Sequence, residues 1–265
     1  MLPSFIIPGP PKSGTTSLQF YLDKHPEIFV TGETHFFSSN YDKGIEWYKN
    51  FFRNVTERVV GEKSPSYFFH PEAPKRIKKH IPNTKLIFIF RNPVDRAYSH
   101  YWHEARAARE NAPFEKAIKR ELDQKVGNDN LKYLEIGKYI LHLKRWKKYF
   151  QKSQMFFLTL EELNKERLKQ LLEFLEVDKN FDFGKLKKYN IGGEPRSRVL
   201  SKLSQHAAVK KIPYFSDFIS RVINMRRGKY PAMKSDTRRY LLEYFDDYNQ
   251  DLEKFTGLDL SKWRK

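Results

Sequence analysis

A short loop near the N-terminus combines the residue types that bind phosphate or sulfate groups. It reads P-P-K-S-G-T-T-S over residues 10–17, between an apolar run and a segment with helical periodicity. The first turn of a helix offers unpaired N–H groups, and glycine lets the backbone approach an anion closely. Lysine and hydroxyl side chains add further donors. The residues predicted to bind the anion are Lys12, Ser13, Gly14, Thr15, Thr16 and Ser17.

This loop has the glycine spacing of a Walker A motif but lacks its lysine. Gly9 and Gly14 are spaced as that motif requires, whereas Thr15 stands in the lysine position and the basic residue is Lys12. The pattern therefore indicates a phosphate loop without the lysine of the ATPases. A phosphate-loop kinase or nucleotide phosphotransferase is the first alternative, and it would prefer ATP with Mg²⁺.

A second anion site is predicted after the apolar segment 85–90. Arg91 follows this segment, at the edge where open α/β sheets bind their ligands. Pro93 suits the first position of a helix, and Ser99 falls on that helix.

Acid–base groups follow two other predicted strands. Glu33 and His35 are two residues apart, so their side chains share one side if the segment is extended. Lys63 lies at the end of another apolar segment, in the sequence G-E-K-S-P-S-Y. A carboxylate at the sheet edge is a candidate general base.

These motifs together resemble the sulfotransferases that use 3′-phosphoadenosine 5′-phosphosulfate (PAPS), in a bacterial-type member of the heparan sulfate and carbohydrate sulfotransferase family. P-K-S-G-T-T resembles the family's 5′-phosphosulfate loop, and R-N-P-V-D-R-A-Y-S resembles its 3′-phosphate motif. E-T-H-F-F followed by G-I-E-W-Y, and E-K-S-P-S-Y, resemble its catalytic segments. The resemblance extends from residue 4 to Trp263.

The resemblance implies a sulfuryl transfer from PAPS to a hydroxyl or amine, by in-line displacement and without a metal. Glu33 would be the general base with His35 beside it, and Lys63 would lie at the junction of donor and acceptor. Lys12 would stabilise the leaving phosphate. The 3′-phosphate would bind Arg91 and Ser99, and the loop folding over the nucleotide would contain Arg227, Gly228 and Lys229. The acceptor is expected to be a glycan or another hydroxyl compound.

The alternation of apolar segments and helical patterns predicts a three-layer α/β fold, with a mainly parallel sheet between helices. The resemblance implies the phosphate-loop sulfotransferase version of this fold, as a single domain over residues 1–265. Predicted strands are 4–8, 28–30, 58–61, 85–90 and 154–159. Predicted helices are 15–24, 45–52, 71–80, 93–110, 114–126, 133–150, 164–175 and 235–255. Residues 178–224 are less regular.

The formal net charge of +18 predicts attraction to polyanions. A non-catalytic protein that binds acidic glycans or nucleic acid is therefore the second alternative, although no specific nucleic-acid motif is found. No apolar run approaches the roughly 20 residues of a membrane helix, and no signal peptide is expected. A bacterial protein of this kind would be cytoplasmic. The absence of cysteine excludes disulfides and thiolate metal sites.

Overall fold

The computed structural model describes residues 1–125, 131–186, 193–195, 225–227 and 231–264. The chain divides into two compact units, which are described separately. The first unit contains residues 1–92, 138–189 and 246–265, and the second contains residues 93–137 and 190–245. The single domain expected from the sequence stays a prediction.

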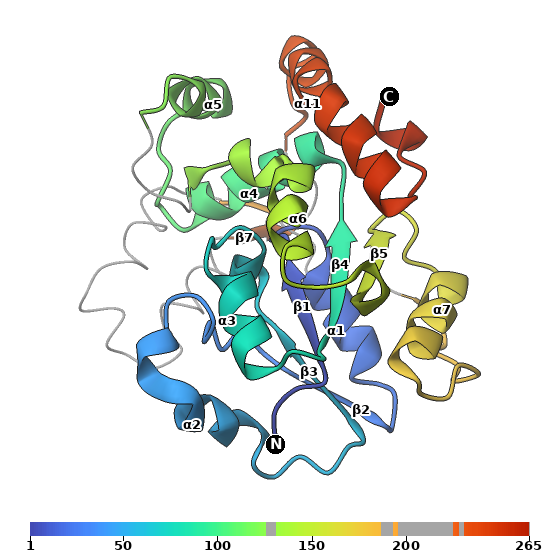
Figure 1. Ribbon diagram of the computed structural model, residues 1–265. Helices are drawn as coiled ribbons and strands as arrows, with labels where there is room; N and C mark the ends of the chain where they lie inside the picture. The colour runs from blue at the N-terminus through green and yellow to red at the C-terminus, as the bar shows by residue number, and fades with distance from the viewer. Residues whose placement is uncertain (126–130, 187–192, 196–224, 228–230, 265) are drawn as a thin grey trace. The chain divides into compact units, whose positions relative to one another are not determined.

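The first unit is built on a five-stranded sheet in the order β2-β3-β1-β4-β5, and all four strand pairings are parallel (Figure 1). This confirms the predicted parallel α/β architecture. The chain builds β2 and β3 on one side of β1 and then crosses to form β4 and β5 on the other. The strands are β1 (Phe5–Gly9), β2 (Ile28–Thr31), β3 (Val59–Lys63), β4 (Lys85–Phe90) and β5 (Met155–Thr159).

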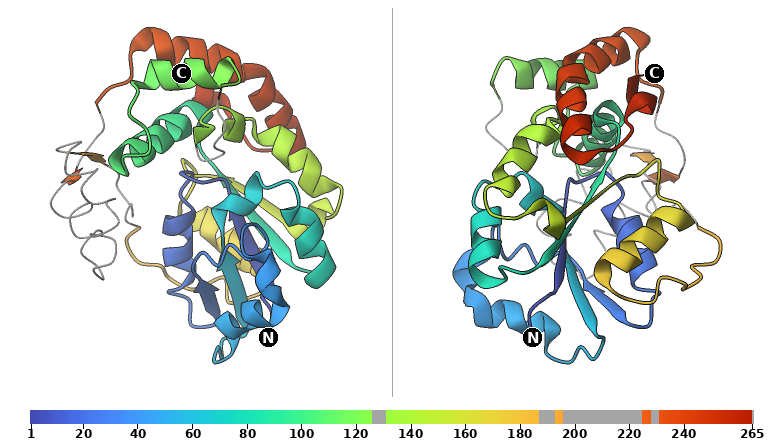
Figure 2. Two further views of the ribbon diagram at one scale, coloured as in Figure 1. Left: turned by 90° about the vertical axis from the view of Figure 1, so that its left-hand side faces the viewer. Right: turned by 45° about the vertical axis from the view of Figure 1, so that its right-hand side comes forward.

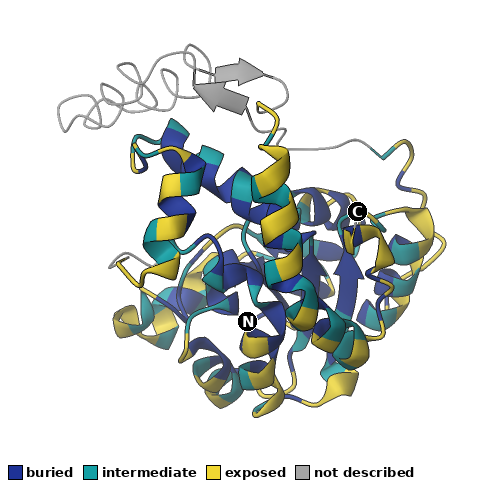
Figure 3. Ribbon diagram, turned by 90° about the horizontal axis from the view of Figure 1, so that it is seen from above, coloured by how far each residue is buried: buried dark blue, intermediate teal, exposed yellow. Residues whose placement is uncertain are grey.

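Both faces of this sheet are buried, as expected for parallel strands covered by helices (Figure 3). Strand β4 shows this most simply. Leu86, Phe88 and Phe90 belong to one hydrophobic core, whereas Ile87 and Ile89 belong to the other. Because successive side chains point to opposite faces, one continuous apolar segment serves both cores.

Helices cover the two faces and complete the three predicted layers (Figure 2). Side chains of α1 and α7 pack into one core, and those of α3, α6 and the C-terminal part of α11 pack into the other, together with Tyr48 of α2. These helices are α1 (Thr15–Leu22), α2 (Gly44–Lys49), α3 (Ala73–His80), α6 (Tyr139–Lys147), α7 (Lys165–Leu175) and α11 (Ser235–Thr256).

The second unit is mainly helical. It contains α4 (Pro93–Arg106), α5 (Phe114–Leu122), the first part of α11, and a short antiparallel pair, β6 (Gly193–Pro195) with β7 (Met225–Arg227). Within this unit the buried guanidinium of Arg96 donates to the carbonyl of Tyr133. Arg238 of α11 forms an ion pair with Asp95 of α4 at 2.8 Å.

Several predicted helices are shorter or divided. The helix predicted over 133–150 consists of a 3-10 turn at Glu135–Gly137 and then α6. Glycine disfavours a continuous helix, and a Cβ at Gly137 would lie 2.9 Å from the ring of Phe245, so this position requires glycine. Among the helices of the described ranges, none has the length and apolar composition needed to cross a lipid bilayer.

Candidate active site

Four predicted site residues of the first unit follow four different strands at the same edge of the sheet. Lys12 comes after β1, Glu33 after β2 and Arg91 after β4, and Lys63 is the last residue of β3. Because the strands are parallel, their carboxyl ends meet at one edge (Figure 1). The parallel order therefore explains how residues far apart in the sequence can serve one reaction.

The phosphate loop follows β1 as predicted, and two glycines allow its close packing. Gly9 has φ 115°, and a Cβ there would lie 2.6 Å from the carbonyl oxygen of Pro65 in the K-S-P segment. Gly14 has φ 98° and directly precedes helix α1. Lys12 also adopts a positive φ, of 66°. The loop thus lies against the end of β3, with the first N–H groups of α1 at its end.

The loop contains a buried hydroxyl that lacks a partner. Ser13 is fully buried, and its Oγ makes no hydrogen bond in the described part of the chain. Such groups are rare and costly in folded proteins. Thr15 and Ser17, at the start of α1, are also buried. These features fit a loop that holds an anionic group with acceptor oxygens.

Glu33 forms a charged cluster with Lys63 and His35. Its Oε1 accepts from Lys63 Nζ at 2.9 Å, and its Oε2 lies 3.3 Å from His35 Nε2. The other ring nitrogen of His35 lies 2.9 Å from Ser66 Oγ. The Lys63 side chain is almost fully buried, whereas that of Glu33 is 41% exposed. The carboxylate of Glu33 is therefore bound by a buried ammonium group while it remains accessible to solvent.

The environment of Glu33 strongly favours its charged form. Burial alone would raise the pKa of this carboxyl, but hydrogen bonds and charge from His35 and Lys63 lower the pKa to about 2. Glu33 is consequently ionised at neutral pH. A carboxylate with so low a pKa accepts a proton poorly, so its basicity depends on whether Lys63 stays in place.

The side chains of Glu33 and His35 lie together as expected, but no continuous strand connects the two residues. Strand β2 ends at Thr31, and His35 has a left-handed backbone with φ 52°. A turn over residues 36–40 follows His35 directly. The backbone at the start of this turn is held by hydroxyl groups that also donate to a residue for which the motif suggested no role.

That residue is Glu62, which is completely buried one position before Lys63. Its carboxylate accepts hydrogen bonds from four hydroxyl groups, two from nearby residues of the chain and two from the more distant Thr34 and Tyr48. Oε1 accepts from Thr34 at 2.5 Å, Ser64 at 2.6 Å and Tyr67 at 2.8 Å, and Oε2 accepts from Tyr48 at 2.5 Å. Burial raises the pKa of Glu62, although the hydroxyl donors favour the ionised form.

The three hydroxyl groups that donate to Oε1 also accept hydrogen bonds from the backbone N–H groups of residues 35–37. The contacts are Phe36 to Thr34 Oγ1 at 3.1 Å, His35 to Ser64 Oγ at 3.2 Å and Phe37 to Tyr67 OH at 3.1 Å. A single carboxylate therefore fixes the turn that follows Glu33. A glutamate inside the otherwise apolar strand sequence V-V-G-E was the signal from which a buried polar network could have been inferred.

The predicted 3′-phosphate residues lie in different units. Arg91 is a half-buried residue of the first unit, and its guanidinium has no hydrogen-bond or ion-pair partner within the described residues. Ser99 is buried on α4 in the second unit. Arg227 ends β7, and Gly228 and Lys229 lie outside the described residues. Across the described ranges, no group of three His, Asp or Glu side chains is arranged to hold a metal.

Comparison with known proteins gives matches over almost the whole chain. A model of the sulfotransferase domain matches residues 2–256. The mouse bifunctional heparan sulfate N-deacetylase/N-sulfotransferase 4 is 31% identical over 290 residues, covering 99% of this chain and 31% of that protein. Mouse heparan sulfate glucosamine 3-O-sulfotransferase 3B1 is 30% identical over 274 residues, covering 97% and 64%. The chain thus spans about a third of the length of the first relative.

A solved structure agrees with these matches. The sulfotransferase from Alicyclobacillus acidocaldarius superimposes with a TM-score of 0.75 at 26% identity, and the match covers 100% of both chains. The likeness therefore includes the helices as well as the sheet. The matches favour the sulfotransferase interpretation over a kinase or a non-catalytic polyanion-binding protein.

Proposed function

Because the chain belongs to the sulfotransferase family, we propose that it transfers a sulfuryl group from PAPS to a hydroxyl or amine of a carbohydrate. The observation that carries this proposal is the cluster of Glu33, Lys63 and His35 at the sheet edge that also bears the phosphate loop. This cluster supports the proposal because a general base and a buried cation would then lie at the same sheet edge as the loop that would hold the leaving phosphate.

On the donor side, the loop residues would hold the 5′ end of the nucleotide. The backbone N–H groups at the start of α1 and the side chain of Lys12 would stabilise charge on the phosphate oxygen as its bond to sulfur breaks. The orphaned hydroxyl of Ser13 fits this role. Arg91, a partly buried cation that has no partner among the described residues, would bind the 3′-phosphate, together with Ser99.

On the acceptor side, Glu33 would take the proton from the attacking hydroxyl or amine while the new bond to sulfur forms. Its low pKa makes the position of Lys63 important. An anion in the loop would give Lys63 a second negative partner. If Lys63 turned from Glu33 toward that anion, the pKa of Glu33 would rise, and the carboxylate would become a stronger base when the donor is bound.

The relatives suggest the acceptor class. The names of both mouse proteins include heparan sulfate, and they specify transfer to nitrogen in one case and to the 3-oxygen of glucosamine in the other. We therefore propose an acidic, glucosamine-containing glycan as acceptor. A screen with labelled PAPS should compare heparosan, its N-deacetylated form and simple alcohols, because the first two separate hydroxyl from amine acceptors.

The variant Glu33→Gln tests the proposal. The amide is nearly the same size but cannot accept the proton, so kcat should fall by about 100- to 10,000-fold while binding of adenosine 3′,5′-bisphosphate is retained. Glu46→Gln is a matched control, because the Glu46 side chain is 80% exposed and, among the described residues, pairs only with Lys49. Near-normal turnover of Glu33→Gln would refute the assignment of the base, and a stronger loss in His35→Ala would move that role to the histidine.

A further inference from the structure

A surface pocket of about 670 Å³ in the first unit is lined by five lysines and by no acidic residue. We call it the lysine pocket, and its lysines are Lys78, Lys147, Lys148, Lys152 and Lys254. They come from α3, from the end of α6 and the segment after it, and from α11. Residues distant in sequence therefore converge on one concave positive surface.

Most of this positive charge is not neutralised. Lys147, Lys148 and Lys152 are exposed, and no carboxylate of the described residues lies within ion-pair distance of them. The one carboxylate of the described ranges near Lys254 is Asp251, at 4.0 Å, and Lys78 donates to the carbonyl of Pro82 at 3.1 Å. The mutual repulsion of these ammonium groups would be relieved by a bound polyanion.

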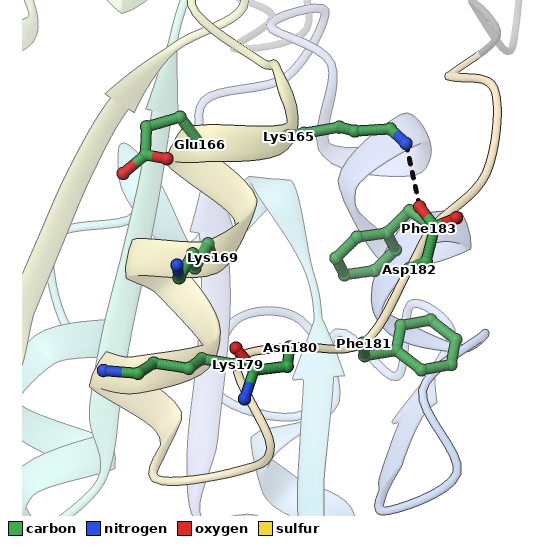
Figure 4. Close-up of a pocket in the computed structure, with 8 residues that line it drawn as sticks. All are labelled: Lys165, Glu166, Lys169, Lys179, Asn180, Phe181, Asp182 and Phe183. Atoms are coloured by element: carbon green, nitrogen blue, oxygen red, sulfur yellow. Dashed lines mark hydrogen bonds and ion pairs between the residues drawn. The ribbon is translucent and has the colours of Figure 1, made fainter.

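A second pocket of the same unit differs in its charge. The pocket of about 270 Å³ at the start of α7 also contains three lysines, but acidic residues accompany them (Figure 4). Lys165 pairs with Asp182 at 2.8 Å, and Lys179 pairs with Glu173 at 2.9 Å. A basic composition alone therefore does not produce an unneutralised pocket, and this second pocket supplies a control.

The lysine pocket lies at the opposite edge of the sheet from Glu33. Lys152 precedes β5, and Lys78 is in the last turn of the helix before β4. Gln154, which directly precedes β5, connects the start of this strand to the segment before β4. Its Nε2 donates to the carbonyls of Pro82 and Thr84 at 3.1 and 3.2 Å. Since the strands are parallel, their starting ends are remote from the carboxyl ends that carry the candidate active site.

We propose that the lysine pocket binds a stretch of an acidic glycan chain and so anchors a long acceptor away from the reaction site. The choice of a glycan rests on the proposed function. It is also favoured by the aromatic rings of the pocket, where Lys147 and Lys152 lie over Phe255 at 5.7 and 5.9 Å and Lys78 lies over Phe150 at 5.3 Å. Ring faces covered by ammonium groups offer no stacking platform for the bases of single-stranded nucleic acid.

The test compares two triple variants with the same change of net charge. Lys147→Gln/Lys148→Gln/Lys152→Gln alters the lysine pocket, and Lys165→Gln/Lys169→Gln/Lys179→Gln alters the control pocket. Fluorescent heparin, heparosan and a single-stranded oligonucleotide are titrated over a range of salt concentrations. For the glycans, the lysine-pocket variant should bind about tenfold or more weakly, and the slope of log K against log salt should decrease by up to about 3.

Kinetics with long and short acceptors distinguish the anchor from the reaction site. The lysine-pocket variant should have a higher KM for long heparosan, with kcat and the KM of a short oligosaccharide unchanged. Equal losses in both triple variants would overturn the proposal, since net charge alone would then govern binding. A larger loss for the oligonucleotide would instead assign the pocket to nucleic acid.

The anchor and the proposed function can fail separately. If wild-type protein binds heparin through the lysine pocket but transfers sulfate to no glycan, the proposed function fails and the anchoring site stands. If transfer to short glycans is normal and the lysine-pocket variant binds long chains as tightly as wild type, only the anchor is refuted.

Discussion

The variant Tyr48→Phe should destabilise the protein through the buried carboxylate of Glu62. Tyr48 is fully buried, and its hydroxyl donates to Glu62 Oε2 at 2.5 Å. The ring stacks on Phe36 with centroids 4.6 Å apart, and phenylalanine keeps this packing. The substitution therefore removes one hydrogen bond to a charged acceptor and creates no large cavity.

The magnitude follows from the different surroundings of the two oxygens. Oε1 of Glu62 has three hydroxyl donors, whereas within the described residues Oε2 has only Tyr48. Hydrogen bonds to charged groups contribute about 1.5–3 kcal/mol, and an orphaned buried acceptor carries its full desolvation cost. We expect the free energy of unfolding at neutral pH to fall by about 2–3 kcal/mol.

The loss should also depend on pH. Burial raises the pKa of Glu62, and removal of the Tyr48 hydroxyl, which favours the charged form, raises it further. A carboxyl with a raised folded-state pKa contributes stability that is complete below its ordinary pKa and is lost as the pH rises through the folded-state pKa. Protonation of Glu62 stabilises the variant more than it stabilises the wild type. The difference between their free energies of unfolding should therefore decrease from neutral pH to about pH 5.

Denaturant unfolding at both pH values measures this difference, with Tyr149→Phe as control. Tyr149 is half-buried, and its hydroxyl makes no hydrogen bond within the described residues, so its loss should change stability by less than about 0.5 kcal/mol. Equal effects of the two substitutions, or a Tyr48→Phe deficit that stays constant with pH, would refute the proposed role of Glu62 as a charged acceptor.

Three further predictions concern the candidate active site. Lys12→Ala should lower kcat by about a hundredfold or more through loss of a charged contact to the leaving phosphate, and a loss of only a few-fold would contradict that role. Arg91→Ala and Ser99→Ala should weaken the binding of adenosine 3′,5′-bisphosphate much more than that of adenosine 5′-phosphate, as measured by titration calorimetry. Equal losses of affinity for the two nucleotides would argue against a 3′-phosphate site. Lys63→Met should raise the pKa of Glu33 from about 2 toward the ordinary carboxyl range, as measured by NMR titration of its side chain. An unchanged pKa would show that Lys63 does not hold the carboxylate in solution.

The sequence was sufficient to predict the sheet and the phosphate loop, because both depend on local patterns. Residues 85–90 form β4 with the predicted bounds, since a short apolar run can be buried on both faces of a parallel sheet. The other four strands were found with ends displaced by one or two residues. Helix ends were less accurate because they depend on packing, as the contact between Gly137 and Phe245 illustrates.

Three features were decided only by the tertiary structure. The left-handed turn at His35 is held by Glu62 through hydroxyls from Thr34, Ser64 and Tyr67, which come together only when β2 and β3 pair. The low pKa of Glu33 is due to His35 and Lys63, and Lys63 is brought near by the same pairing.

The lysine pocket is the third such feature. It depends on α3, α6 and α11 ending near one edge of the sheet, and no local sequence pattern marks its five lysines as neighbours. The sequence by itself determined which residues could carry charge and which segments could be buried. The tertiary structure decided which charges lie close enough to alter one another, because electrostatic interactions depend on distance in space and on burial.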